Sequence, residues 1–177
     1  MPSLDQPKDQ WDPVYLMGVS GCGKTVIGSE LAKQLGGTFI DGDDLHPPAN
    51  KEKMGTGIAL NDEDRYPWFE AIHQSILSTE QRPVIVACSA LKRTYRDILR
   101  AEQNRAVFVY LEGSFDLIMS RIQKRDHEYM PSDLLHSQFD TLEEPTADEH
   151  VIIMSIQPEV SEIVNLLISR LSNSLTN

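Results

Sequence analysis

Short apolar runs alternate with longer segments of helical period along most of the chain. The runs that predict strands are residues 14–18, 38–41, 83–88, 106–111 and 150–156. Residues 84–87 and 107–111 are continuously apolar, which is typical of strands buried on both faces. Strands that alternate with helices in this way predict an α/β fold, with a five-stranded parallel sheet covered by helices.

Four segments have the apolar spacing of amphipathic helices, namely 24–35, 91–101, 115–124 and 159–171. In the first segment Ile27, Leu31 and Leu35 recur every four residues, and two glycines follow as a helix stop. Residues 43–80 and 126–146 break the alternation. Their prolines, glycines and charges predict insertions around a site.

The ends and the composition of the chain indicate one domain large enough to fold without disulfides or metal. Residues 1–11 are polar and contain proline, which predicts a mobile N-terminal tail before a single domain over 12–177. The sequence has neither a signal-peptide pattern nor an apolar run of membrane-spanning length. The two cysteines, Cys22 and Cys88, lack metal-ligand spacing and fit a reducing compartment, so we expect a cytoplasmic protein.

The charge of the chain excludes some classes of partner. With 16 basic and 27 acidic residues the formal net charge is −11. This charge repels phosphate backbones and anionic lipids at long range, so we expect neither nucleic acid nor a membrane as a partner. The composition does not decide the oligomeric state, and a homodimer stays open.

A phosphate-binding motif follows the first predicted strand and opens the first predicted helix. Residues 18–25 match the pattern GxxxxGK[ST] and are Gly18, Val19, Ser20, Gly21, Cys22, Gly23, Lys24 and Thr25. In this setting the loop amides surround a β-phosphate, Lys24 reaches the β- and γ-phosphate oxygens, and the Thr25 hydroxyl can bind Mg²⁺. A glycine-rich turn without a nucleotide is the alternative, but such a turn does not require Lys24 and Thr25 together. We therefore expect a nucleotide and Mg²⁺ to bind here.

Several other classes of nucleotide-binding protein are excluded. The chain lacks the Asn-Lys-x-Asp motif of GTPases and the Leu-Ser-Gly-Gly-Gln motif of transporters, and 177 residues are too few for a motor or an AAA-type module. A small-molecule kinase remains.

Carboxylates follow the second predicted strand at Asp41 and Asp43, at the sheet edge where open α/β sheets bind ligands. One of them can help to hold Mg²⁺ while the other accepts the proton of an acceptor hydroxyl. A turn followed by a helix N-cap uses aspartates in the same way, and this alternative stays open.

Six blocks of the chain together resemble the small gluconokinases, relatives of shikimate kinase and the nucleoside monophosphate kinases. The blocks are 18–25, 41–47, 50–54, 60–68, 87–96 and 138–145. The resemblance implies a P-loop kinase domain of the nucleoside monophosphate kinase type that phosphorylates D-gluconate at its 6-hydroxyl with ATP, giving 6-phospho-D-gluconate. A shikimate or nucleoside monophosphate kinase, or a non-catalytic nucleotide-binding regulatory module, is the alternative.

The resemblance also implies roles for individual residues. Strand 83–88 ends without the aspartate that many P-loop proteins use for Mg²⁺, and Thr25 and Asp41 are implied as metal ligands instead. Asp43 is expected to act as the base, while Lys24 acts on the phosphates.

D-gluconate needs cations for its carboxylate and polar groups for its hydroxyls. The insertion over about 43–80 and the segment after the third strand supply six candidates, His46, Lys53, Asp62, Arg65, Lys92 and Arg96. Solvated surface charges, or a turn in the case of His46, are the alternatives.

Residues from about 124 to 137 resemble the lid of this kinase superfamily. Arg121 and Arg125 lie one helical turn apart and are expected to bind ATP, where they would screen the charge of the transferred phosphate and exclude water. Of the two, Arg125 is expected to be catalytic. A basic helix end favoured by the helix dipole is the alternative.

Cys22 lies within the phosphate-binding motif, at a helix N-terminus and two residues from Lys24. Both features favour a reactive thiolate. The alternative is a small residue in a tight loop, with its sulfur turned inward and inert.

Overall fold

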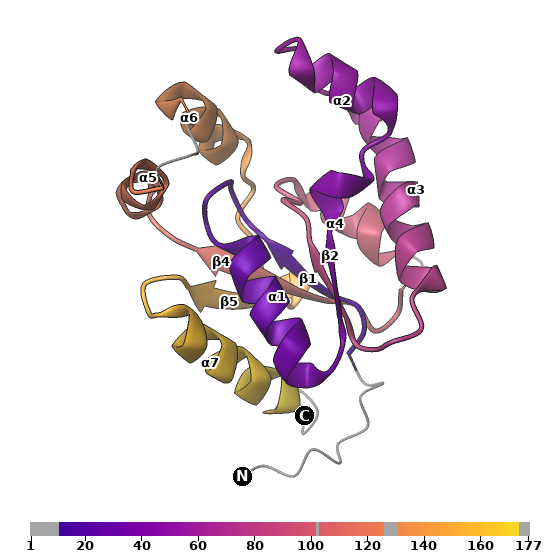
Figure 1. The fold of residues 1–177 in the computed structure, drawn as a ribbon, viewed down its shortest axis with the longest axis vertical. Coiled ribbons are helices and arrows are strands. Elements are labelled where there is room, and N and C mark those ends of the chain that lie inside the picture. Colours follow the sequence, from indigo (N-terminus) through magenta and orange to yellow (C-terminus); the bar gives the residue numbers. More distant parts are fainter. Residues whose placement is uncertain (1–10, 102, 126–130, 174–177) are drawn as a thin grey trace.

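The computed structural model describes residues 11–101, 103–125 and 131–173. Five strands form one parallel sheet in the order β2-β3-β1-β4-β5 (Figure 1). They are β1 (Val14–Met17), β2 (Thr38–Asp41), β3 (Val84–Ala87), β4 (Val107–Glu112) and β5 (Ile152–Ser155). The predicted fold class and all five predicted strands are confirmed, while the predicted tail lies outside the described residues except for Trp11.

Seven α-helices are found in the described part of the chain. They are α1 (Lys24–Leu35), α2 (Pro48–Gly55), α3 (Asp62–Ser78), α4 (Arg93–Arg100), α5 (Phe115–Gln123), α6 (Ser132–Thr141) and α7 (Val160–Asn173), and two short 3₁₀ helices, η1 (Gly42–Leu45) and η2 (Ala147–Glu149), accompany them. The predicted helix 24–35 has the observed bounds, and the other three agree within two residues. Of the two regions predicted as insertions, 43–80 contains most of η1 and all of α2 and α3. The second region, 126–146, contains α6.

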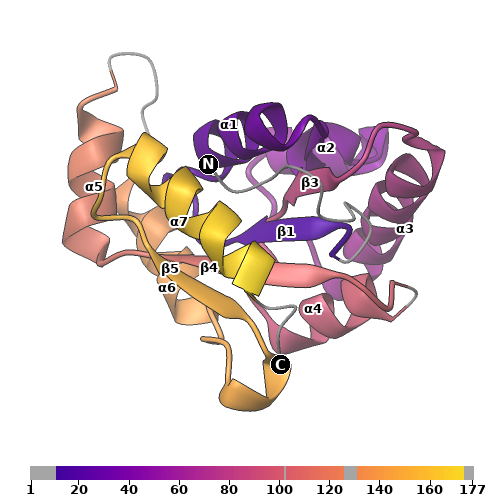
Figure 2. The same ribbon diagram turned by 90° about the horizontal axis from the view of Figure 1, so that it is seen from below.

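The sheet has a hydrophobic core on each face. On one face Leu16 and Val109 pack with α1, α5, α6 and α7, and Figure 2 shows α1 and α7 side by side. On the other face Tyr15, Val86 and Phe108 pack with α3 and α4. This double burial explains why the central strands are continuously apolar. Within the described ranges, no helix is both long and apolar enough to cross a bilayer.

Helix ends follow local sequence signals. α1 ends at Gly36, which has a φ of 66° and donates its N–H to the carbonyl of Lys33. α3 begins with a capping box, in which Asn61 and Asp64 each accept a hydrogen bond from the other's backbone N–H. These bonds fix the points at which the chain leaves α1 toward β2 and enters α3.

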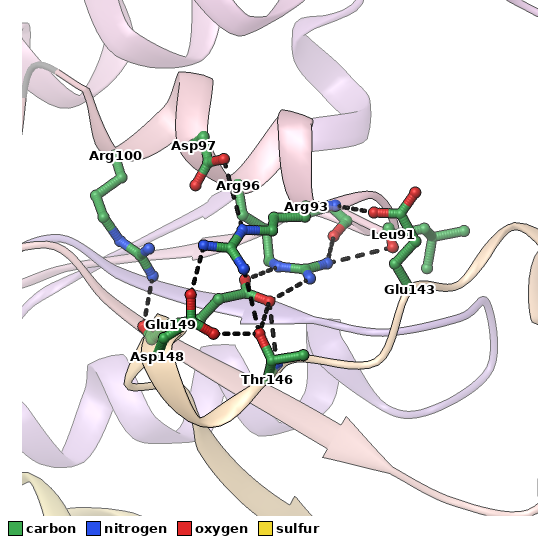
Figure 3. Close-up of polar contacts among 10 residues, drawn as sticks. Leu91, Arg93, Arg96, Asp97, Arg100, Glu143, Thr146, Asp148 and Glu149 are labelled. Atoms are coloured by element: carbon green, nitrogen blue, oxygen red, sulfur yellow. Dashed lines mark hydrogen bonds and ion pairs between the residues drawn. The ribbon is translucent and has the colours of Figure 1, made fainter.

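Arg96 has a different role from the one predicted. The residue is fully buried, and its guanidinium donates from Nε and Nη2 to the Glu149 carboxylate at 2.6 and 2.9 Å (Figure 3). Its Nη1 donates to the carbonyls of Ala90 and Leu91 at 3.0 and 3.2 Å. We therefore correct the expectation that Arg96 binds substrate: its guanidinium joins α4 to η2 inside the fold.

A second set of contacts joins the start of α4 to the segment after α6. The backbone N–H of Arg93 donates to Glu143 Oε2 at 2.7 Å, and the N–H of Glu143 donates to the carbonyl of Leu91 at 2.8 Å (Figure 3). On the surface, the Arg93 guanidinium binds Asp148 at 2.7 Å. The residues that precede α4 are therefore held from a distant part of the chain.

We expect the substitution Arg96→Ala to lower the free energy of unfolding by roughly 3–5 kcal/mol, because it leaves the buried Glu149 carboxylate without a partner. Urea denaturation followed by circular dichroism measures this change. The double substitution Arg96→Leu/Glu149→Leu should cost less than Arg96→Ala alone. Asp148→Asn is the control, since it breaks only an exposed pair and should have a much smaller effect. Equal effects of Arg96→Ala and Asp148→Asn would contradict the role assigned to the buried pair.

Candidate active site

The loop between β1 and α1 has the backbone of a phosphate-binding loop. Gly23 is the N-cap of α1 with a φ of 101°, and no side chain caps the first turn of the helix. Gly21 has a φ of 82°, and a Cβ there would lie 2.7 Å from the side chain of Ile122 on α5. Glycine is therefore required at both positions by conformation, and at Gly21 also by space. The uncapped amides of α1 are suited to bind an anion.

Lys24 lies across this loop. Its ammonium donates to the carbonyls of Gly18 and Val19 at 2.9 and 3.1 Å and lies 3.9 Å from Cys22 Sγ. These bonds hold the charge over the loop without neutralising it. Lys24 therefore lies at the loop, and its role on the phosphates stays a prediction.

The structure brings together Thr25 and Asp41, the two predicted metal ligands. Thr25 Oγ1 donates to Asp41 Oδ2 at 3.2 Å, and Asp41 Oδ1 accepts the N–H of Asp43 at 3.1 Å as the N-cap of η1. A hydroxyl and a carboxylate are hard oxygen donors of the kind Mg²⁺ prefers. Over the described ranges no cluster of three or more His, Cys, Asp or Glu side chains could hold a metal. The pair therefore fits an ion held mainly by phosphate oxygens and water, rather than one enclosed by protein.

Asp43 follows β2 at the carboxyl edge of the sheet. The turn that carries it is fixed by Trp68, whose indole N–H donates to the carbonyl of Gly42 at 2.7 Å. Partial desolvation and the neighbouring Asp41 charge raise the pKa of Asp43, and the Lys24 ammonium opposes the shift. A carboxyl with a raised pKa is a better proton acceptor than an ordinary aspartate.

His46 lies against Trp68 at the end of the same turn. The two rings stack with centroids 4.0 Å apart, and His46 Nδ1 lies 3.4 Å from Asn50 Nδ2. Burial, together with the Arg65 and Lys51 charges, lowers the pKa of His46 to about 4. The imidazole is therefore neutral near pH 7, which suits hydrogen bonding to hydroxyls rather than binding of a carboxylate.

The predicted cations of the acceptor side fall into two groups. Lys53 on α2 forms a 2.6 Å ion pair with Asp64, which also caps α3, so its charge is already matched. By contrast, Arg65 and Lys92 converge on one aromatic ring, with charge centres 5.2 and 5.5 Å from the centroid of Tyr95. These two cations come from α3 and from the residue just before α4.

Tyr95 is a residue of this site that sequence reasoning missed. Both cations lie over its ring, and its hydroxyl donates to Asp62 Oδ1 at 2.7 Å. A signal was present, because Tyr95 follows Lys92 by three residues at the start of a predicted helix and so lies on the same side. Recognising its contact with Arg65 required the tertiary structure.

The predicted lid is described only in part, since residues 126–130 lie outside the described ranges. α5 ends at Gln123, one residue earlier than predicted, and carries Arg121 in its last turn. Arg125 lies in the turn beyond, where its N–H donates to the carbonyl of Ile122 at 3.1 Å. Arg121 and Arg125 therefore leave from the same end of α5.

Both cysteines are buried, each with 1% of its surface exposed. The sulfur of Cys22 is packed in the hydrophobic core beneath the loop, and burial raises the pKa of the Cys88 thiol to about 12. Of the two interpretations of Cys22, the structure favours the inert, inward-facing thiol.

This phosphate-binding loop on a five-stranded parallel sheet, with carboxylates at the carboxyl edge, defines a P-loop kinase. The family model for shikimate kinase matches residues 20–171. The thermosensitive gluconokinase of Escherichia coli K12 is 49% identical over 140 residues, which cover 78% of this chain and 75% of that protein. The thermoresistant gluconokinase of the same organism is 43% identical over 152 residues, covering 84% and 87%.

A solved structure gives the same result. The crystal structure of a gluconokinase from Sinorhizobium meliloti 1021 superposes with a TM-score of 0.83 at 41% identity, covering 94% of this chain and 97% of that one. The chain belongs to the gluconokinase family, and it is an enzyme of the phosphotransferase class.

We expect iodoacetamide to label both cysteines slowly in the folded protein, because neither sulfur is accessible. Mass spectrometry of peptides maps the labelled positions over time. Labelling in urea is the control and should modify both residues quickly. Rapid modification of Cys22 in the folded protein, with protection by ATP and Mg²⁺, would instead support a reactive thiolate.

Proposed function

We propose that this enzyme transfers the γ-phosphoryl group of ATP to the 6-hydroxyl of D-gluconate, giving 6-phospho-D-gluconate and ADP. The main support is the convergence at one sheet edge of the phosphate-binding loop with Asp41 and Asp43, together with the similarity to gluconokinases over most of the chain. We place the reaction in the cytoplasm, because both cysteines are free thiols.

The donor side binds the phosphates. The backbone N–H groups of the loop and of the first turn of α1 donate hydrogen bonds to the β-phosphate. The Lys24 ammonium exchanges its bonds to the carbonyls of Gly18 and Val19 for bonds to β- and γ-phosphate oxygens. Thr25 and Asp41 would hold Mg²⁺, which when bound neutralises charge on the phosphate oxygens. Arg121 and Arg125 add positive charge from the end of α5 and help to exclude water.

On the acceptor side, Asp43 accepts the proton of the attacking hydroxyl. Its raised pKa favours this transfer. Arg65 and Lys92, which both lie over the ring of Tyr95, bind the carboxylate at the other end of the substrate. His46, which is neutral, and Lys53, which is paired with Asp64, provide polar groups for the hydroxyls between these ends.

A coupled ADP-release assay with gluconate, shikimate, AMP and no acceptor tests this function. Of these four conditions, we expect turnover only with gluconate. Lys24→Met should abolish it while leaving the thermal unfolding of the apoprotein little changed, because the Lys24 ammonium bonds only to its own loop. Loss of such a charge should cost at least about 10²-fold in kcat. Preferred turnover of shikimate or AMP would refute the proposed substrate.

Two substitutions separate the roles on the acceptor side. Asp43→Asn should lower kcat with little effect on ATP affinity, since a base acts in the transition state. It should also remove the acid limb of the pH profile, which in the wild type falls as Asp43 is protonated below its raised pKa. Arg65→Ala should mainly raise KM for gluconate, because its contact is equal in the ground and transition states. If Asp43→Asn weakens only ATP binding, Asp43 belongs to the metal site instead.

A further inference from the structure

A glutamine on α6 holds the phosphate-binding loop from a distant part of the chain. Gln138 Oε1 accepts the backbone N–H of Ser20 at 2.7 Å, and Gln138 Nε2 donates to Ser20 Oγ at 2.9 Å. The two residues are 118 positions apart. One carboxamide therefore contacts both the main chain and the side chain of one loop residue.

The chemistry of this contact is specific to a carboxamide. The Ser20 N–H can only donate, so it requires the carbonyl oxygen of Gln138, and the amide nitrogen is left to bind the hydroxyl. A carboxylate could accept both the N–H and the O–H of Ser20, but it would bring a negative charge to a loop that binds phosphates. An apolar side chain of similar size would form neither bond.

α6 itself is fixed at several points. Leu135 is fully buried in the core, and the ring of His136 stacks on Phe115 of α5 with centroids 4.0 Å apart. Just after the helix, Glu143 binds Leu91 and Arg93 on either side of Lys92 (Figure 3). The chain from Gln138 to Glu143 therefore links the phosphate-binding loop to the segment between β3 and α4, which carries the acceptor-side cation Lys92.

We propose that Gln138 is a positioning residue for phosphoryl transfer. Its carboxamide fixes Ser20, and thereby the curvature of the loop, relative to the acceptor side of the site. Gln138 need not touch either substrate to do so. The expected kinetics with gluconate rest on the proposed function. The expected effect of Gln138 on nucleotide binding does not depend on the acceptor.

Binding and kinetics of two Gln138 variants test this role. In Gln138→Leu the loop loses both bonds, so we expect the Kd of ATP-Mg²⁺, measured by calorimetry without an acceptor, to rise by about tenfold, as expected for roughly 1.4 kcal/mol of lost hydrogen bonding. The KM for gluconate should stay within about twofold. Gln138→Glu should keep the apoprotein's thermal stability but still weaken ATP binding, because of charge repulsion.

A double-mutant cycle with Ser20→Ala gives a second test. If Gln138 acts through Ser20, the effects of Ser20→Ala and Gln138→Leu on ATP affinity should not add. Gln74→Leu is the matched control, since Gln74 is exposed on α3, where its amide bonds Glu70 of the same helix. Should Gln138→Leu fail to fold, the cycle is run with Gln138→Ala, which also loses both bonds to Ser20.

Three outcomes would overturn the proposal. They are an unchanged ATP Kd in Gln138→Leu, additive effects in the cycle, and a rise in KM for gluconate with ATP binding intact. A wild-type enzyme that binds ATP but does not phosphorylate gluconate would refute the proposed function alone, because the calorimetric comparison would still stand.

Discussion

The first turn of α1 must keep its backbone amides available for an anion, and this constraint shapes the surrounding site. A serine or aspartate at the N-cap would stabilise the helix by accepting hydrogen bonds from those amides. The chain instead has Gly23 there and no side-chain cap. The stabilisation that a cap would give is supplied by neighbours that contact the loop elsewhere. Gln138 binds Ser20, and Asp41 binds Thr25, so the loop is held without a side-chain cap on the first turn of α1.

Interactions remote from the reacting groups set the acceptor side. The buried pair of Arg96 and Glu149 fixes α4 against η2, and Glu143 caps the first turn of α4. Lys92 and Tyr95 lie at this end of the same helix, so their positions depend on a buried ion pair that does not reach the site. A buried pair is a weak source of stability compared with apolar packing. Its value here is that it orients α4.

How far the sequence predicts this structure depends on the range of each signal. The strands and α1 were predictable because apolar runs, helical period and the glycine stop are local. α2, α3 and α6 were not predicted as helices. α2 and α6 are rich in polar residues and each buries a single side chain, Asn50 and Leu135, respectively. α3 has a proline, Pro67, in its interior, where a proline normally ends a helix. The phosphate-binding loop was predictable from its motif and context. The role of Arg96 was not, because its partner lies 53 positions away and nothing near Arg96 indicates it.

The partners of the cations distinguish those whose charge is matched by a carboxylate from those whose charge is not. Lys53 and Arg96 form short bonds to carboxylates, Asp64 and Glu149, so their charges are matched within the protein. Three other cations are held mainly by neutral groups. Lys24 binds loop carbonyls, Lys92 lies over Tyr95, and Arg65 binds the carbonyl of Leu60 at 2.7 Å while staying 3.9 Å from Asp62.

This difference matters in a chain with a net charge of −11, whose overall field repels both ATP and a sugar acid. Carbonyl oxygens and an aromatic ring orient a cation without cancelling its charge. Lys24, Arg65 and Lys92 therefore keep their positive charges available to a ligand. These charges act on a ligand at short range, whereas salt screens the repulsion of distant carboxylates beyond about 10 Å.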